Sequence, residues 1–191
     1  MATISTLRSA AVRHYLDQLK DTGRGRATFR DALGNITTLL VAHALAELGD
    51  PDDVVFVPII RGGLGMVEGA LAASPGAAVG HVGIYRDRTS RDVIEYYSRV
   101  PAAEGQVAIV LDPMMASGGT MLAAVEAVES AGYSAVAVAT VVAARQGCDL
   151  LAEEAPALTH LFTCEIDDHP PEVGALRNGL GDAGARLYGT A

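Results

Sequence analysis

The chain has 191 residues, of which half are hydrophobic and 19% are charged, and this composition excludes a disordered protein. Its formal net charge of −9 argues against nucleic acid as a partner, because that binding depends on neutralising phosphates. A small anionic ligand stays compatible with this charge, since a local site can be positive on an acidic protein. The length fits one domain, 1–191, with an expected N-terminal helical segment at 1–50, a core at 54–165 and a C-terminal segment at 166–191.

The cysteines and the N-terminus indicate the compartment. Cys148 and Cys164 stand in unrelated contexts, without metal-ligand spacing or a disulfide framework. We therefore expect a reducing, cytoplasmic location. Residues 1–20 carry charges throughout, so no signal peptide is expected, and no apolar run reaches the roughly 18 residues of a membrane-spanning helix.

Two amphipathic helices are predicted first, over residues 7–19 and 28–48, because apolar side chains recur in both at helical spacing. Residues 21–26 form a loop rich in glycine and arginine between them. Residues 49–52 (GDPD) end the second helix.

From residue 54 onward, apolar strands alternate with helices. We predict strands at 54–60, 78–85, 107–111, 135–142 and 158–163. We predict helices at 64–73, 119–131 and 146–154. Residues 86–101 interrupt this rhythm with a polar stretch, which we interpret as a flexible arm or hairpin. The alternation indicates an α/β fold with a mostly parallel, open sheet flanked by helices on both faces.

The predicted sheet locates a site before any motif is considered. Ligands of open parallel sheets bind beyond the carboxyl ends of the strands. Four segments are expected to meet there, namely residues 60–65, 85–91, 112–120 and the loop after Cys164.

The segment from Asp112 to Thr120 has the features of an anion site. It joins a strand to a helix N-terminus, whose free N–H groups and dipole favour negative charge. Gly118 and Gly119 allow a close backbone approach, and Ser117 and Thr120 add hydroxyl donors. Asp112 would instead accept hydrogen bonds from sugar hydroxyls. No lysine follows the glycines, so this is not a Walker loop, and an ordinary strand-to-helix turn remains the alternative.

Three segments together resemble uracil phosphoribosyltransferases. Residues 57–66 (VPIIRGGLGM) and 111–120 (LDPMMASGGT) are similar to the two signature segments of that family. Residues 179–184 (GLGDAG) resemble its C-terminal uracil loop, and residues 186–190 (RLYGT) follow in the family's order. The likeness extends from about Phe29 to the C-terminus.

The resemblance implies a type I phosphoribosyltransferase fold, with residues 166–191 as a small acceptor-binding hood. It implies Mg²⁺-dependent transfer of the phosphoribosyl group from 5-phosphoribosyl diphosphate (PRPP) to uracil, giving uridine monophosphate (UMP) and diphosphate. The implied PRPP contacts are Arg61, Arg86, Asp112, Pro113, Met114, Met115, Ala116, Ser117, Gly118, Gly119, Thr120 and Asp182. The implied base contacts are Met114, Ala116, Leu176, Gly181, Asp182 and Ala183. Mg²⁺ would be held mainly by PRPP and water, and a homodimer or higher homo-oligomer is expected.

The implied reaction suits these residue types. Breaking the anomeric bond builds positive charge on the ribose and negative charge on the diphosphate, which Arg61, Arg86 and Mg²⁺ would stabilise. Asp112 would hold the ribose hydroxyls, and Asp182 would orient the acceptor ring or a water. These four side chains are the expected catalytic set, and positioning alone would supply much of the rate.

Four departures from the family pattern leave the acceptor open. Asn178, preceded by Arg177, stands where the family usually has proline, and Ala185 stands where it has an acidic residue. Ala175 replaces a tyrosine often found there. Residues 49–54 are short where the family normally carries an extra hairpin-like arm, so the oligomeric state is open as well.

Two alternatives to uracil transfer follow. The first is the same donor with another small heterocyclic or aromatic acceptor in a specialised pathway, since Arg177 brings a new charge close to the expected pocket. The second is a non-catalytic, nucleotide-sensing regulator on the same fold. The acidic balance argues against RNA binding, and the presence of Asp112, Arg61 and residues 181–183 argues against lost catalysis.

Within the arm, Arg91 is interpreted as part of a solvated loop. Arg88 is evenly balanced between that interpretation and a diphosphate contact from a mobile lid. Tyr96 and Tyr97 are interpreted as packing residues, with a role in a dimer as the lesser alternative.

After the last predicted strand, Glu165, Asp167, Asp168 and His169 are interpreted as an acidic loop rather than a metal site, because their spacing matches no ligand set. Cys164 is interpreted as a small buried residue. The implied reaction needs no covalent step, and no histidine partner for Cys164 is indicated.

Overall fold

The computed structural model describes residues 2–51, 53–87, 90, 92–103, 107–169 and 176–190. Within these ranges, eight strands form one sheet in the order β1-β8-β7-β6-β2-β4-β5, with β3 beside β2. All neighbours are parallel except β4 and β5, which form an antiparallel hairpin. The strands are β1 (Thr3–Thr6), β2 (Val54–Ile60), β3 (Ala78–Val79), β4 (His81–Arg86), β5 (Val93–Arg99), β6 (Val107–Met115), β7 (Val136–Ala144) and β8 (Leu158–Asp167).

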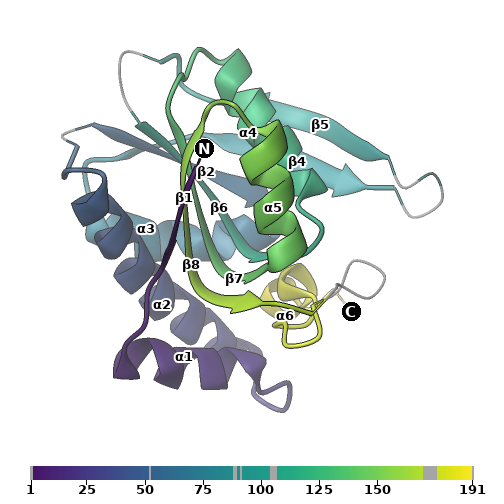
Figure 1. Cartoon of the computed structure of the whole chain (residues 1–191). Coiled ribbons are helices and arrows are strands. Elements are labelled where there is room, and N and C mark those ends of the chain that lie inside the picture. Colours follow the sequence, from purple (N-terminus) through teal and green to yellow (C-terminus); the bar gives the residue numbers. More distant parts are fainter. Residues whose placement is uncertain are drawn as a thin grey trace.

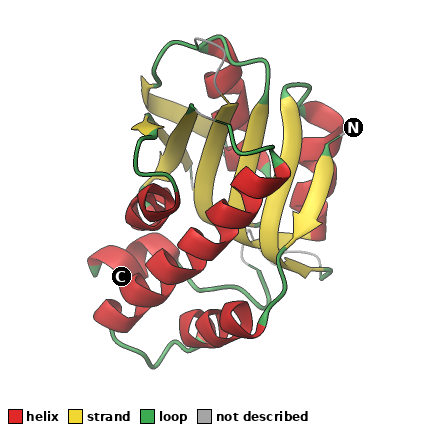
Figure 2. Cartoon of the chain, turned by 90° about the vertical axis from the view of Figure 1, so that its left-hand side faces the viewer, coloured by secondary structure: helices red, strands yellow, loops and turns green. Residues whose placement is uncertain are grey.

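Helices cover both faces of the sheet (Figures 1 and 2). The helices are α1 (Ala10–Lys20), α2 (Arg26–Glu47), the 3-10 helix η1 (Gly62–Met66), α3 (Val67–Ala73), α4 (Gly119–Ser130), α5 (Arg145–Glu154) and α6 (Ala183–Tyr188). Helices α1, α2 and α3 lie on one face, and α4 and α5 on the other. The predicted α/β fold with a mostly parallel sheet is confirmed.

The sheet separates two hydrophobic cores. Phe29 and Leu33 of α2 pack toward Phe162 of β8 in one core, while Met121 of α4 and Tyr133 belong to the other. Each of these side chains is at most 2% exposed. Burying a large apolar side chain stabilises a fold by about 1.5–3 kcal/mol, so the two cores fix the strand ends that carry the site.

Two elements escape the apolar patterns. Strand β1 is short and mostly polar, yet it pairs in parallel with β8, with Thr3 opposite His160, so the segment 1–50 is not purely helical. Helix α6 has six residues, and Asp182 caps its N-terminus. The single strand predicted at 78–85 is divided at Gly80 into β3 and β4.

Strand β6 is longer than its apolar run predicts. Its pairing with β7 continues from Asp112 to Met115, on both sides of Pro113, which has no N–H to donate. The loop before α4 therefore shrinks to residues 116–118, and Asp112 lies within the strand. Within the described ranges, none of the helices has the length and apolar character needed to cross a membrane.

Candidate active site

A cavity of about 790 Å³ lies at the carboxyl ends of the central strands. Its lining is Ile59, Ile60, Arg61, Gly62, Ile84, Tyr85, Tyr96, Asp112, Met114, Thr120, Leu176, Gly181, Asp182, Ala183 and Gly184. These residues come from the end of β2, the β4–β5 hairpin, the β6–α4 connection and the C-terminal segment. The four segments predicted to meet beyond the strand ends do meet there.

The connection between β6 and α4 is tightly built. Gly118 takes a left-handed conformation with φ of +87° at the N-cap of α4, where no side chain caps the helix. A Cβ on Gly118 would lie 3.0 Å from the backbone of Gly147 in α5, so only glycine fits without a shift. The first N–H groups of α4 are thus free of a side-chain cap, as an anion site requires.

The side chains of the predicted anion-site segment, residues 112–120, point in different directions. Asp112, Met114 and Thr120 line the cavity, whereas Met115 is 3% exposed and packs in the core with α4 and α5. Strand alternation explains this difference, because Met114 and Met115 point to opposite faces of the sheet. A ligand contact by Met115 would have to come from its backbone.

The remaining loop residues differ in burial. Pro113 and Gly118 are buried, and Ala116 and Gly119 are partly buried. Ser117 lines a second, smaller cavity of about 510 Å³. None of these five residues belongs to the described lining of the main cavity.

Asp112 lies at the floor of the cavity. A Cβ on Gly62 would lie 3.0 Å from the Asp112 Oδ1 atom, so this glycine lets the β2–η1 connection approach the carboxyl group. Burial raises the pKa of Asp112 to about 8, although the backbone N–H of Met114 opposes the rise. The charged carboxylate would therefore gain from hydroxyl donors supplied by a ligand.

Arg61, directly after β2, contacts the C-terminal segment of the chain. It follows a cis peptide bond after Ile60, and its Nη1 atom donates to Thr190 Oγ1 at 2.8 Å. Its guanidinium also lies beside Gly184, where a Cβ would be 3.6 Å from Arg61 Nη2. Arg61 is exposed and belongs to the lining of the cavity.

Arg86, Arg88 and Arg91 belong to the predicted arm. Arg86 is the last residue of β4, and only its backbone is described. Arg88 and Arg91 lie outside the described residues. The predicted diphosphate contact of Arg86 stays a prediction, as do the two interpretations of Arg88 and the solvated-loop interpretation of Arg91.

The C-terminal segment forms the opposite wall. Leu176 is 8% exposed, and Gly179 approaches β6 so closely that a Cβ there would lie 2.9 Å from Met114 Sδ. Asp182 Oδ1 accepts a hydrogen bond from the Ala185 N–H at 2.8 Å. The side chain of Asp182 therefore caps α6 and shapes this wall, a local role that its motif did not indicate.

Arg186 attaches this wall to the N-terminal helices. Its guanidinium donates to the carbonyl oxygen of Leu19, and to those of Leu180 and Asp21 at 2.9 Å each. It also stacks 4.0 Å above the ring centre of Phe29. The family-like segment 186–190 includes Arg186 but does not indicate its role, because its partners are carbonyl groups that any residue carries.

Tyr96 corrects an expectation. It was predicted to be a packing residue, but it lines the cavity and is 56% exposed. Its ring centre lies 6.0 Å from that of Tyr85, so the two tyrosines form one aromatic edge of the site. Tyr97 is 45% exposed as well, and the pairing of β4 with β5 is irregular at Tyr96 and Tyr97.

The residues after β8 do not share one environment. Glu165 pairs with Lys20 at 2.5 Å, Asp168 pairs with Arg145 at 3.0 Å, and Asp167 is buried. Cys164 is buried, and burial raises the pKa of its thiol to about 12. Among the described side chains, no group of three or more His, Cys, Asp or Glu is arranged to hold a metal ion.

Known proteins share both the sequence and the fold. The family model for uracil phosphoribosyltransferase matches residues 47–190. The chain is 32% identical to the uracil phosphoribosyltransferase of Listeria innocua over the full length of both, and 35% identical to that of Brevibacillus brevis over 94% of each. The chain belongs to the uracil phosphoribosyltransferase family.

Solved structures share the fold of this chain. The AQ2163 protein from Aquifex aeolicus superposes with a TM-score of 0.91 and 28% identity, covering 99% of each chain. A hypoxanthine phosphoribosyltransferase from Staphylococcus aureus gives a TM-score of 0.56 over 86% of this chain and 84% of its own, at 16% identity. This second likeness shows the fold alone, and with it the type I phosphoribosyltransferase architecture is confirmed.

The departures from the uracil phosphoribosyltransferase pattern can now be located. Arg177 and Asn178 are exposed and do not belong to the described lining of the cavity. Ala185 contributes its backbone N–H to the Asp182 cap, which any residue except proline could do. Ala175 lies outside the described residues. The short connection before β2 turns through Gly49 and Asp50, both with positive φ.

Proposed function

We propose that this member of the uracil phosphoribosyltransferase family transfers the phosphoribosyl group of PRPP to uracil, giving UMP and diphosphate. One observation carries the proposal. Asp112, Arg61, the N-terminus of α4 and residues 181–184 converge on a single cavity. Family membership supplies the reaction, and this convergence supplies a place for both substrates.

On the donor side, the ribose 5-phosphate would bind the free N–H groups at the N-terminus of α4, helped by the Thr120 hydroxyl. The two ribose hydroxyls would donate to Asp112. Those hydrogen bonds would favour the charged carboxylate, whereas burial in the ligand-free protein raises the Asp112 pKa to about 8.

Arg61 would stabilise the leaving diphosphate. Its fork of permanently charged donors suits a diphosphate, which would compete with Thr190 for the Nη1 atom. Arg86, at the end of β4, is proposed as the second arginine of this contact. The negative charge that develops on the diphosphate makes these contacts stronger in the transition state than before it.

On the acceptor side, uracil would lie between Met114 and the backbone of residues 181–183. Recognition by backbone groups tolerates the side-chain departures noted above. The Asp182 side chain caps α6. We therefore propose that it orients the backbone of residues 181–183, and we assign it no role in removing the acceptor's proton. Binding the two reactants in one cavity would supply much of the rate.

Mg²⁺ is proposed to arrive with PRPP. The described lining contains two carboxylates, Asp112 and Asp182, and the second is engaged as a helix cap. This arrangement fits an ion held mainly by diphosphate oxygens and waters. When bound, Mg²⁺ would neutralise charge on the leaving diphosphate.

One assay tests the proposal. The protein is incubated with PRPP, Mg²⁺ and a panel of bases, and diphosphate release is followed together with product mass. We expect UMP from uracil. Turnover only with a different ring would show that this ring, and not uracil, is the acceptor. Tight PRPP binding without any turnover would indicate a regulator.

The cytoplasmic location and the homodimer or higher homo-oligomer also remain proposals. Sedimentation velocity at micromolar concentration tests the second. A species of single-chain mass that still turns over uracil would overturn it.

A further inference from the structure

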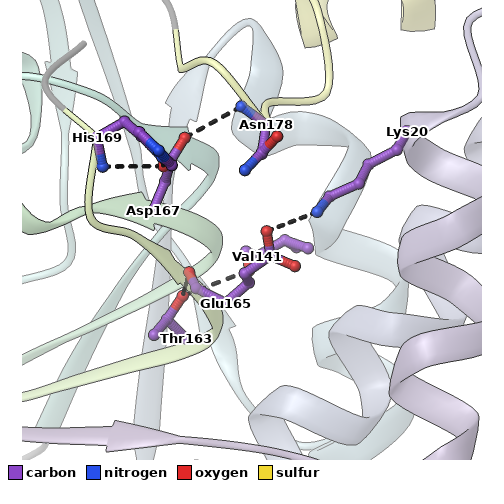
Figure 3. Close-up of polar contacts among 7 residues, drawn as sticks. All are labelled: Lys20, Val141, Thr163, Glu165, Asp167, His169 and Asn178. Atoms are coloured by element: carbon purple, nitrogen blue, oxygen red, sulfur yellow. Dashed lines mark hydrogen bonds and ion pairs between the residues drawn. The ribbon is translucent and has the colours of Figure 1, made fainter.

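The last residue of β8 is a buried carboxylate surrounded by donors. Asp167 is 3% exposed. Its Oδ2 atom accepts the peptide N–H of Asn178 at 3.0 Å, and its Oδ1 atom accepts the N–H of His169 at 3.1 Å and lies 2.8 Å from His169 Nδ1. Figure 3 shows Asn178 and His169 directed at this carboxylate from two sides. The bond from Asn178 is the main reason that the pKa of Asp167 falls to about 2.

The strand end that carries Asp167 is itself firmly placed. Asp167 pairs with Ala144 of β7 in the sheet. Two residues earlier, Glu165 forms its 2.5 Å ion pair with Lys20 of α1, and Thr163 Oγ1 donates to the Glu165 carbonyl at 3.0 Å (Figure 3). The carboxylate of Asp167 is therefore a fixed point of the sheet.

Asn178 belongs to residues 176–184, which form the acceptor-side wall of the cavity. It lies between Leu176, which lines the cavity, and Gly179, which approaches Met114. Neither Asp167 nor Asn178 lines the cavity among the described residues. Their hydrogen bond thus acts on the position of the wall and not on a ligand.

We propose that Asp167 is a positioning residue for acceptor binding, which it controls by holding residues 176–184 through the peptide N–H of Asn178. The inference rests on the proposed function, since it assigns the acceptor to this wall. It also gives one departure from the family pattern a physical meaning. Proline at position 178 would have no N–H, so this hydrogen bond requires a residue other than proline, as this chain has there.

The first test compares two substitutions at one position. Asn178→Ala keeps the peptide N–H, and Asn178→Pro removes it. We expect Asn178→Ala to stay within about twofold of the wild-type constants, whereas Asn178→Pro raises the KM for uracil about tenfold and leaves the KM for PRPP within about twofold, as loss of a hydrogen bond to a buried charge predicts.

The second test uses neighbouring aspartates, because proline also restricts the backbone before it. Asp167→Asn should raise the KM for uracil about tenfold, since the amide places a donor opposite one of the peptide N–H groups. Asp168→Asn is the matched control, because the Asp168 side chain is 75% exposed and pairs with Arg145 instead. The double variant Asp167→Asn/Asn178→Pro should be no worse than the more impaired single variant, since both remove the same bond.

Hydrogen exchange provides a readout that does not need activity. In Asp167→Asn and Asn178→Pro, the amides of residues 176–187 should exchange at least about tenfold faster, while those of β6 and α4 keep wild-type rates. Equal changes in both KM values, an Asp168→Asn variant as impaired as Asp167→Asn, or faster exchange throughout the protein would overturn the inference. A wild-type protein without uracil turnover would refute the proposed function, and the exchange experiment would still decide whether the tie exists.

Discussion

The donor side of the cavity is built from the sheet, whereas the acceptor side is attached to it. Asp112, Met114 and Thr120 lie on β6 and at the start of α4, where ladder pairing and helix packing fix them. Residues 176–182 and the six-residue helix α6 that follows them lie outside the sheet and depend on side-chain hydrogen bonds for their position. Asp167 and Arg186 supply these attachments. Substitutions on the two sides should therefore affect different constants.

The largest effect is expected at Asp112, on the donor side. Asp112→Asn removes the charge that accepts the ribose hydroxyls, and kcat/KM should fall by about 100-fold or more, the size of two lost hydrogen bonds to a charged group. Steady-state kinetics with varied PRPP measure the loss. Full activity in this variant would remove Asp112 from the donor site.

The same variant carries a pH signature in the ligand-free protein. Burial raises the pKa of Asp112 from 3.8 to about 8, so the folded protein retains a proton that the unfolded chain releases. Its contribution to stability therefore falls as pH rises from about 4 to 8. Asp112→Asn, which resembles the protonated acid, should have a higher Tm than wild type at pH 8 and a similar Tm near pH 4. Thermal melts across this range check the sign, and a difference that does not vary with pH would contradict the assigned burial.

A smaller donor-side effect is expected at Gly118. Gly118→Ala adds a Cβ 3.0 Å from the Gly147 backbone at a left-handed position, so the loop of residues 116–118 must shift. The KM for PRPP should therefore rise about tenfold. Gly132→Ala is the control, because Gly132 also has positive φ but its Cβ would lie at an ordinary 3.5 Å from Ala103. It should cost about 1–2 kcal/mol of stability and leave both KM values unchanged. Equal kinetics in the two variants would show that the loop tolerates the shift.

On the acceptor side, Arg186→Ala should act mainly through stability. It removes three hydrogen bonds from a guanidinium to carbonyl groups and the contact over Phe29, which together should cost about 2–4 kcal/mol of unfolding free energy. The KM for uracil should rise more than the KM for PRPP. Arg24→Ala, which removes an exposed pair with Asp21, should change little. Urea unfolding of both variants measures the loss of stability. An equal loss of PRPP and uracil binding in Arg186→Ala would contradict the separation of a donor side from an acceptor side.

The smallest effect is expected at Arg177. Its side chain is exposed and outside the described lining, so Arg177→Ala should change kcat/KM for uracil by less than about twofold, as surface substitutions usually do. The base panel repeated with this variant provides the measurement. A selective loss of turnover with an anionic ring would instead revive the alternative acceptor.

The elements that local patterns predict are the long apolar ones. The strands β2, β6 and β7 and the helices α2 and α4 all appear near their expected places, because burial on both faces leaves an uninterrupted apolar signature. Strand β1 was missed because a short polar segment becomes a strand only beside β8. Tyr96 was misjudged because its exposure depends on the hairpin that β4 and β5 form.

The sequence by itself determined the α/β alternation and the donor motif, since each depends on residues that are neighbours in the chain. The alternation predicts a parallel sheet, and a parallel sheet brings the strand ends together. Only the tertiary structure decided the roles of Asp167, Asp182 and Arg186. Asp167 and Arg186 contact backbone groups 11 and 165 residues away, and a backbone N–H or C=O looks the same at nearly every residue. The capping role of Asp182 depends on α6, a short helix that the apolar pattern does not predict. For this reason the donor could be inferred from a motif, whereas the way the acceptor wall is held required the fold.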